Sequence, residues 1–157
     1  MPSPSEPDPT PEPTAVDLRD YVVFDLAGAS GRRVFATDVV AVDLVCLEPG
    51  QAVEPRTFPG ADAIYTVLGG RVWIVTDEAE VTLTALQSLL VPPAVPHALR
   101  NDSPDPLILQ VVVSPPDEAP DAVLGPAVDG AADGDADPSG PSRAGLAARL
   151  RRTLGGE

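Results

Sequence analysis

The chain has 157 residues, a formal net charge of −14 and a sequence pI of about 4.2. Such a charge repels phosphate backbones and acidic membrane surfaces, so the composition argues against nucleic-acid binding and makes a role at a membrane surface unfavourable. No apolar run approaches the roughly 18 residues that span a bilayer, and no basic segment followed by an apolar one opens the chain, which predicts a cytoplasmic protein.

The first segment, residues 1–16, is rich in proline and acidic residues and is predicted to be a disordered arm. Eight short β-branched or apolar segments follow, separated by turn sequences. Eight short strands without a long helical period predict an antiparallel sandwich or barrel over residues 17–114. The predicted strands are residues 21–26, 33–37, 39–47, 63–68, 71–76, 81–86, 89–91 and 107–113.

One of these strands, residues 39–47, has two different sides. Cys46 lies on its apolar side and is predicted to be a small buried hydrophobic residue, whereas Asp43 lies on the other, which we expect to be wetter. Trp73, between two aliphatic neighbours, is predicted to fill the core or to wall a pocket.

The chain changes character again after the last strand. Residues 115–141 are rich in Asp, Ala, Gly and Pro, which predicts a flexible acidic linker. Residues 142–157 are predicted to form a short basic amphipathic helix, with Leu146, Leu150 and Leu154 on one side. A helix this short has marginal stability by itself, so we expect a partner to order it. Two alternatives remain open: the segment docks onto the chain's own acidic surface, or it is disordered.

The segment 39–113 resembles the cupin superfamily, which implies a small jelly-roll barrel. The second cupin motif, G-x5-P-x-G-x2-H-x3-N, is matched at Pro92, His97 and Asn101. Its two glycine positions are occupied by Leu86 and Ala94.

The first cupin motif, G-x5-H-x-H-x3-4-E-x6-G, begins at Gly50 and ends at Gly70. Its two histidine positions hold Arg56 and Phe58, and its glutamate position holds Ala63. Cupins bind metal through these two histidines, this glutamate and the histidine of the second motif, so the resemblance leaves only His97 as a ligand. Because catalytic metal sites usually need three protein ligands, we expect neither a metal nor another cofactor.

A different ligand set remains conceivable if strand registers shift. It would consist of Glu54, Asp62 and His97, two carboxylates and one imidazole.

Without a metal, Arg56 would be a fixed cation in a pocket walled by Phe58, Tyr65 and Trp73, able to receive a carboxylate or a phosphate. Alternatively, Arg56 points to solvent or pairs with an acid at the rim. His97 either bonds to a backbone carbonyl or to Gln110 without further function, or serves as an acid or base with Tyr65 as its partner, as in metal-free cupin isomerases.

These observations predict a metal-free cupin that binds a small polar or anionic ligand or acts as an interaction module. Its terminal segment is similar to the addressing peptides of cargo proteins packed into bacterial protein shells. The alternative function is an enzyme, either a metal-dependent oxygenase or isomerase, or a metal-free isomerase with His97 as its base. Because such barrels often pair through edge strands, we also expect a homodimer.

Overall fold

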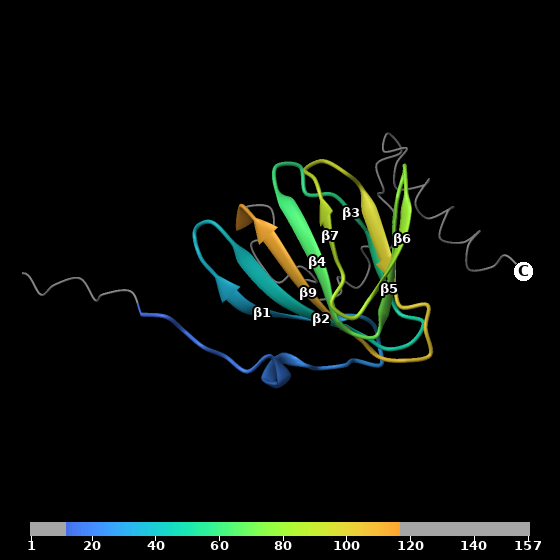
Figure 1. Cartoon of the computed structure of the whole chain (residues 1–157), viewed down its shortest axis with the longest axis horizontal. Coiled ribbons are helices and arrows are strands. Elements are labelled where there is room, and N and C mark those ends of the chain that lie inside the picture. The colour runs from blue at the N-terminus through green and yellow to red at the C-terminus, as the bar shows by residue number, and fades with distance from the viewer. Residues whose placement is uncertain (1–11, 117–157) are drawn as a thin grey trace, which may run out of the picture.

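The computed structural model describes residues 12–116, which form nine β-strands and one short 3-10 helix (Figure 1). The strands are β1 (Ser30–Ala36), β2 (Ala41–Leu47), β3 (Ala52–Arg56), β4 (Asp62–Gly69), β5 (Arg71–Thr76), β6 (Glu80–Thr84), β7 (Ser88–Val91), β8 (His97–Arg100) and β9 (Leu107–Ser114). The helix is η1 (Leu18–Tyr21).

The strands form two antiparallel sheets that face each other. One sheet has the order β1-β2-β9-β4-β7 and the other the order β3-β8-β5-β6. Side chains that alternate along each strand point into the space between the sheets, as Ala63, Tyr65 and Val67 do on β4. The predicted all-β barrel is therefore confirmed.

Seven of the eight predicted strands are present, and the one predicted over residues 21–26 is wrong. Asp17 caps η1 by accepting a hydrogen bond from the backbone N–H of Arg19, and the chain then runs past β2, where Val23 lies beside the thiol of Cys46. Both edges of β2 already pair, with β1 and β9, so residues 21–26 cannot join the sheet there.

Two short strands, β3 and β8, were not predicted. β3 contains Glu54 and Pro55, which are poor strand formers, and β8 has only four residues. Each pairs with the other, and β8 also pairs with β5, so these strands depend on tertiary contacts rather than on local propensity.

Gly70 turns the chain from β4 in one sheet to β5 in the other. Its φ is +88°, and a Cβ atom there would lie 2.3 Å from the carbonyl oxygen of Pro106. Only glycine satisfies both conditions, which explains the closing glycine of the first motif.

The two positions where the second motif departs from glycine keep a glycine-like backbone. Leu86 has φ 70° and Ala94 has φ 67°, and within residues 12–116 no other non-glycine residue has a positive φ. Leu86 and Ala94 thus adopt the backbone conformation that glycine favours, although both carry a Cβ atom.

Cys46 has the environment predicted for it. Its side chain is 1% exposed on the outer side of β2, and burial raises the pKa of its thiol, partly opposed by the backbone of Val23. It is a small buried hydrophobic residue.

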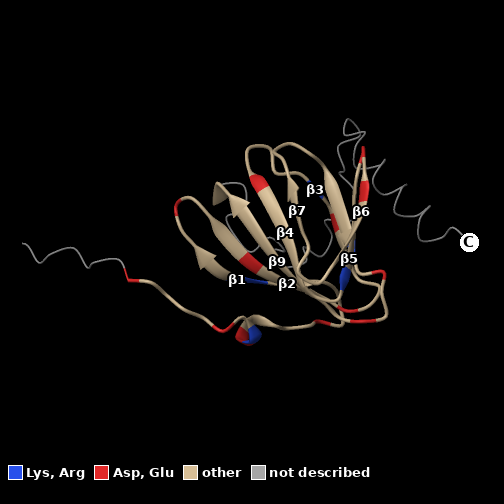
Figure 2. Ribbon diagram, in the orientation of Figure 1, with Lys and Arg blue, Asp and Glu red and all other residues tan. Residues whose placement is uncertain are grey.

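In the described residues, Asp and Glu lie in several turns and also within strands such as β2 and β6 (Figure 2). No helix within residues 12–116 is long and apolar enough to cross a membrane. The predicted helix over 142–157 lies outside the described residues, as do residues 117–141 of the predicted linker and residues 1–11 of the predicted N-terminal arm.

Candidate functional site

The centre of the barrel holds a hydrogen-bonded pair from opposite sheets. Tyr65 comes from β4 and His97 begins β8, and each is 1% exposed. The Tyr65 Oη and the His97 Nε2 lie 2.5 Å apart, and the two rings meet edge to face with their centroids 5.3 Å apart.

The hydrogen bond made by the other ring nitrogen of His97 determines which group donates in the bond between Tyr65 and His97. Nδ1 lies 3.0 Å from the carbonyl oxygen of Val95, and because a carbonyl only accepts, Nδ1 carries the hydrogen. Nε2 of the neutral ring is then an acceptor, and Tyr65 donates to it. Burial lowers the pKa of His97, opposed in part by Val95 and assisted by the positive charge of Arg56, while burial raises the pKa of Tyr65. Both groups are therefore neutral at pH 7.

Arg56, at the end of β3, lies opposite His97 in the strand register. Together with Tyr65 and five aliphatic side chains it lines an interior cavity of about 10 Å³; the aliphatic residues are Val45, Val53, Leu99, Leu109 and Val111. Burial lowers the pKa of the guanidinium, and the nearby Tyr65 and Asp43 act in the opposite direction. Within residues 12–116, Arg56 is thus the one charged residue in a lining of Tyr65 and aliphatic side chains, and of the three predicted walls only Tyr65 belongs to it.

A buried ion pair lies near Arg56. Asp43 on β2 is fully buried, and its carboxylate oxygens accept hydrogen bonds at 2.9 and 3.4 Å from Arg33 on β1. Sequence reasoning did not select either residue for the site. The available signal was an aspartate in an otherwise apolar strand, and the side of β2 expected to be wetter proves to be the one that faces the barrel interior.

Phe58 is buried beside the central pair, with its ring centroid 6.0 Å from that of His97. It occupies the second histidine position of the first motif and fills space there with an apolar ring. Phe58 and His97 therefore pack together beside Tyr65, but neither lines the cavity that Arg56 and Tyr65 share, which corrects the expectation that both line the pocket.

Trp73 does not belong to this group. It alternates along β5 with Val72 and Ile74, which lie in the main core, and it forms a separate cluster with Val75 and Ala98. Trp73 therefore faces outward from the four-stranded sheet, which corrects the expectation that it walls the interior pocket.

The residues present do not fit the metal that this fold commonly carries. Both nitrogens of His97 are engaged in hydrogen bonds, and a guanidinium and a phenyl ring stand at the two other imidazole positions. Glu54 and Asp62 are exposed and alternate with the inward-facing Val53 and Ala63, so the conceivable second ligand set does not converge. Within residues 12–116, no three His, Cys, Asp or Glu side chains are grouped so that they could hold an ion.

Asn101, the last residue of the second motif, has a structural role. Its Nδ2 donates to the carbonyl oxygens of Leu47 at 3.1 Å and of Asp105 at 2.7 Å, and its Oδ1 accepts from Ser103. This buried amide ties the loop between β8 and β9 to the end of β2.

A larger cavity of about 90 Å³ has no charged residue among the described residues that line it. Its lining is apolar apart from one threonine and consists of Ile74, Thr76, Ala79, Val81, Leu89, Leu90, Val91, Pro92 and Val95. We place the candidate site at the smaller cavity, because of the two cavities it is the one whose lining holds both a cation, Arg56, and Tyr65, the hydrogen-bond partner of His97.

The comparisons with known proteins agree with this architecture. The sequence pattern of the cupin domain matches residues 43–114, and the chain belongs to the cupin superfamily. The protein TT1209 of Thermus thermophilus is 31% identical, with a TM-score of 0.62 over 64% of this chain and 96% of that one. An uncharacterised double-stranded β-helix protein of Klebsiella pneumoniae is 22% identical, with a TM-score of 0.64 over 68% of this chain and 94% of that one. A cupin superfamily protein of Desulfitobacterium hafniense is 19% identical, with a TM-score of 0.56 over 66% and 93%. No functionally curated protein matches the sequence.

Proposed function

We propose that this cupin binds a small anion, a carboxylate or a phosphate, without a metal. The observation that carries the proposal is the guanidinium of Arg56 in the wall of the interior cavity. Among the described residues that line this cavity, Arg56 is the one charged group and the others are Tyr65 and aliphatic side chains. An anion in such a place gains a charge-assisted, bidentate hydrogen bond in surroundings where water competes little.

The size of the cavity limits what can bind. A volume of about 10 Å³ has room for about one water molecule. Arg56 is partly exposed, although its Nε is buried. The proposed ligand is therefore a small molecule that reaches Arg56 with its anionic group, while its remainder stays outside the cavity.

The test uses the full chain, a panel of mono- and dicarboxylates, and inorganic phosphate. We expect at least one probe to raise the melting temperature, because a ligand at 100 times its Kd stabilises the folded state by about 2.7 kcal/mol. Arg56→Gln should abolish this shift. Arg32→Gln, which removes an exposed arginine from β1, is the matched control and should retain it.

Two outcomes overturn the proposal. Either no probe stabilises the wild-type chain at millimolar concentration, or a probe stabilises the Arg56→Gln variant as strongly as the wild type. Titration calorimetry with the same probe separates loss of binding from a change in folding.

The hydrogen bond between Tyr65 and His97 favours one second candidate, a metal-free isomerase. Tyr65 lines the cavity and His97 does not, so the Tyr65 oxygen would take the substrate proton while its own proton passes to Nε2 of His97. This candidate requires that Tyr65→Phe abolish proton exchange into carbonyl substrates in D2O. Exchange that persists in this variant contradicts it.

A further inference from the structure

A second hydrophobic cluster lies on the outer face of the four-stranded sheet. Trp73 and Val75 alternate with core residues along β5, and Ala98 on β8 is the register partner of Val75. These three side chains therefore point away from the barrel interior.

The cluster is buried although it faces outward. The exposed fractions are 4% for Trp73, 0% for Val75 and 1% for Ala98. The edge strands of the same sheet differ, because Glu54 on β3 and Thr82 on β6 are exposed.

The buried strip is thus confined to β8 and β5, the two central strands. Since neighbouring strands lie about 4.8 Å apart, it is about as wide as one α-helix with its side chains, roughly 10 Å.

Nothing else in the described chain completes this cluster. No other apolar side chain of residues 12–116 packs against it. Arg100, opposite Trp73 in the register, has a buried Nε with no hydrogen-bond partner among these residues. A large aromatic ring and a buried donor side by side are typical of a surface covered by another segment.

We propose that residues 142–157 of the same chain bind this strip. Leu146, Leu150 and Leu154 repeat at helical spacing and would span about 12 Å along it. They provide the narrow apolar face that a strip two strands wide can accept.

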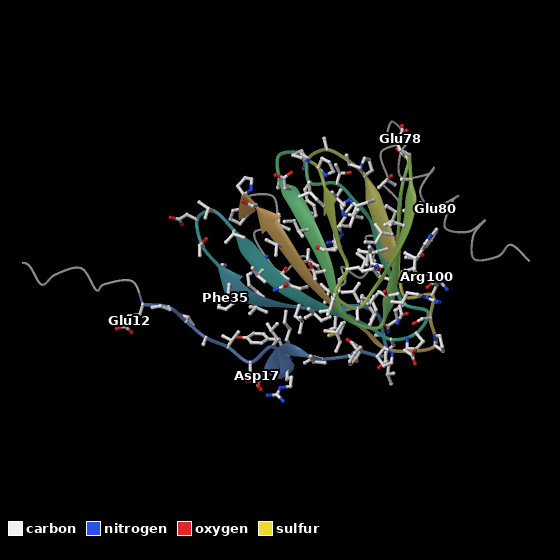
Figure 3. The ribbon with its side chains drawn as sticks, viewed as in Figure 1. Glu12, Asp17, Phe35, Glu78, Glu80 and Arg100 are labelled. Atoms are coloured by element: carbon white, nitrogen blue, oxygen red, sulfur yellow. The ribbon has the colours of Figure 1, made fainter. Side chains whose placement is uncertain are left out.

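The charges agree with this placement. At helical spacing, Arg149 and Arg151 lie on either side of the leucine stripe, and exposed acids, Glu54 on β3 and Glu80 on β6, flank the strip. Figure 3 shows Glu78, Glu80 and Arg100 on the side of the four-stranded sheet. Carbonyl oxygens of the bound segment would serve as acceptors for Arg100.

The connecting chain is long enough. β9, the last strand, lies in the other sheet, and residues 117–141 supply about 25 residues with an r.m.s. reach of roughly 25–30 Å. Two packed sheets lie only about 10 Å apart. A tether of this length gives an effective concentration near the millimolar range, enough for a helix that is marginal alone.

This inference does not depend on the proposed anion binding. It also changes how the terminal segment would act as a docking peptide. A partner that binds residues 142–157 must first remove them from the barrel, so partner binding would expose Trp73.

The only tryptophan of the chain lies under the proposed contact, so its fluorescence reports on it directly. We expect Leu150→Asp in the full chain to shift the emission of Trp73 to longer wavelength and to raise its acrylamide quenching constant several-fold. Ala148→Asp adds the same charge away from the leucine side and should leave both unchanged. Circular dichroism checks that the barrel stays folded in each variant.

Three outcomes overturn the inference. The first is an unchanged Trp73 signal in Leu150→Asp. The second is an equal change in Ala148→Asp, which would indicate a general charge effect. The third is a wild-type signal that shifts toward that of Leu150→Asp on tenfold dilution, because the covering segment would then belong to a second copy.

Discussion

Replacing Leu86 and Ala94 by glycine should stabilise the protein, although glycine usually weakens a fold. Both residues have a left-handed backbone, with φ values of 70° and 67°. A side chain with a Cβ atom costs roughly 1–2 kcal/mol in this conformation, and glycine avoids that cost. Glycine also loses more chain entropy on folding, by roughly 0.5–1 kcal/mol. The expected net gain is therefore about 0.5–1 kcal/mol for each substitution.

Neither substitution removes much buried surface, because Leu86 is 84% exposed and Ala94 is also exposed. The backbone N–H groups of the two residues donate to different carbonyls, those of Val67 and Phe58, so the two gains should add to about 1–2 kcal/mol. For a domain of about 100 residues this raises the melting temperature by roughly 5–10 °C.

Urea denaturation followed by the fluorescence of Trp73 measures the free energy of unfolding. Ala85→Gly is the matched control, since Ala85 is an exposed neighbour of Leu86 without a positive φ. This substitution should lower the free energy of unfolding by about 0.5–1 kcal/mol. If Leu86→Gly and Ala94→Gly destabilise the protein as much as the control does, the argument from backbone strain is refuted.

Three further predictions concern the buried polar groups. Asn101→Asp should lower the free energy of unfolding by about 2–4 kcal/mol in the same assay, because a carboxylate would face two carbonyl oxygens. The control Asp102→Asn, at an exposed ion pair, should change the free energy of unfolding by less than about 1 kcal/mol. Equal losses in the two variants would contradict the structural role of Asn101. Since burial lowers the pKa of His97, the unfolded chain binds the proton more readily, so stability should fall as the pH drops below about 6.5, by at most about 1.4 kcal/mol per pH unit. The NMR signal of this single histidine should titrate below 6.5, His97→Gln should flatten the pH dependence, and a titration at or above 6.5 would contradict the prediction. Tyr65→Phe removes the donor that favours the neutral ring, so the same signal should titrate at a higher pH than in the wild type, and an unchanged or lower value would argue against the assigned direction of the bond.

Several features of the site could be predicted from sequence because they depend on motif spacing. Pro92, His97 and Asn101 align the second motif, and this alignment places His97 inside the barrel and Arg56 at a former ligand position. Tyr65 was a predicted partner of His97 because it lies on a strand of the same barrel. The ligand itself stays a proposal, because a pocket composed mostly of aliphatic residues carries little chemical information about its occupant.

Other features depended on which face of a strand points inward. Trp73 was predicted to wall the pocket because it lies in an unbroken apolar run, Val72 to Val75, in which local periodicity does not distinguish the two sides. The ion pair between Arg33 and Asp43 was missed because its members are ten positions apart on different strands. The homodimer and the cytoplasmic location remain predictions.

The amino-acid pattern by itself determined the all-β class, seven strands and the loss of the metal ligands, since these depend on local alternation, turn residues and residue identity. Only the tertiary structure decided that residues 21–26 form no strand, that β3 and β8 exist, and that Trp73 faces outward. Each of these depends on strand pairing between distant segments, because a strand's edges and faces are defined only by the neighbours it meets in the fold.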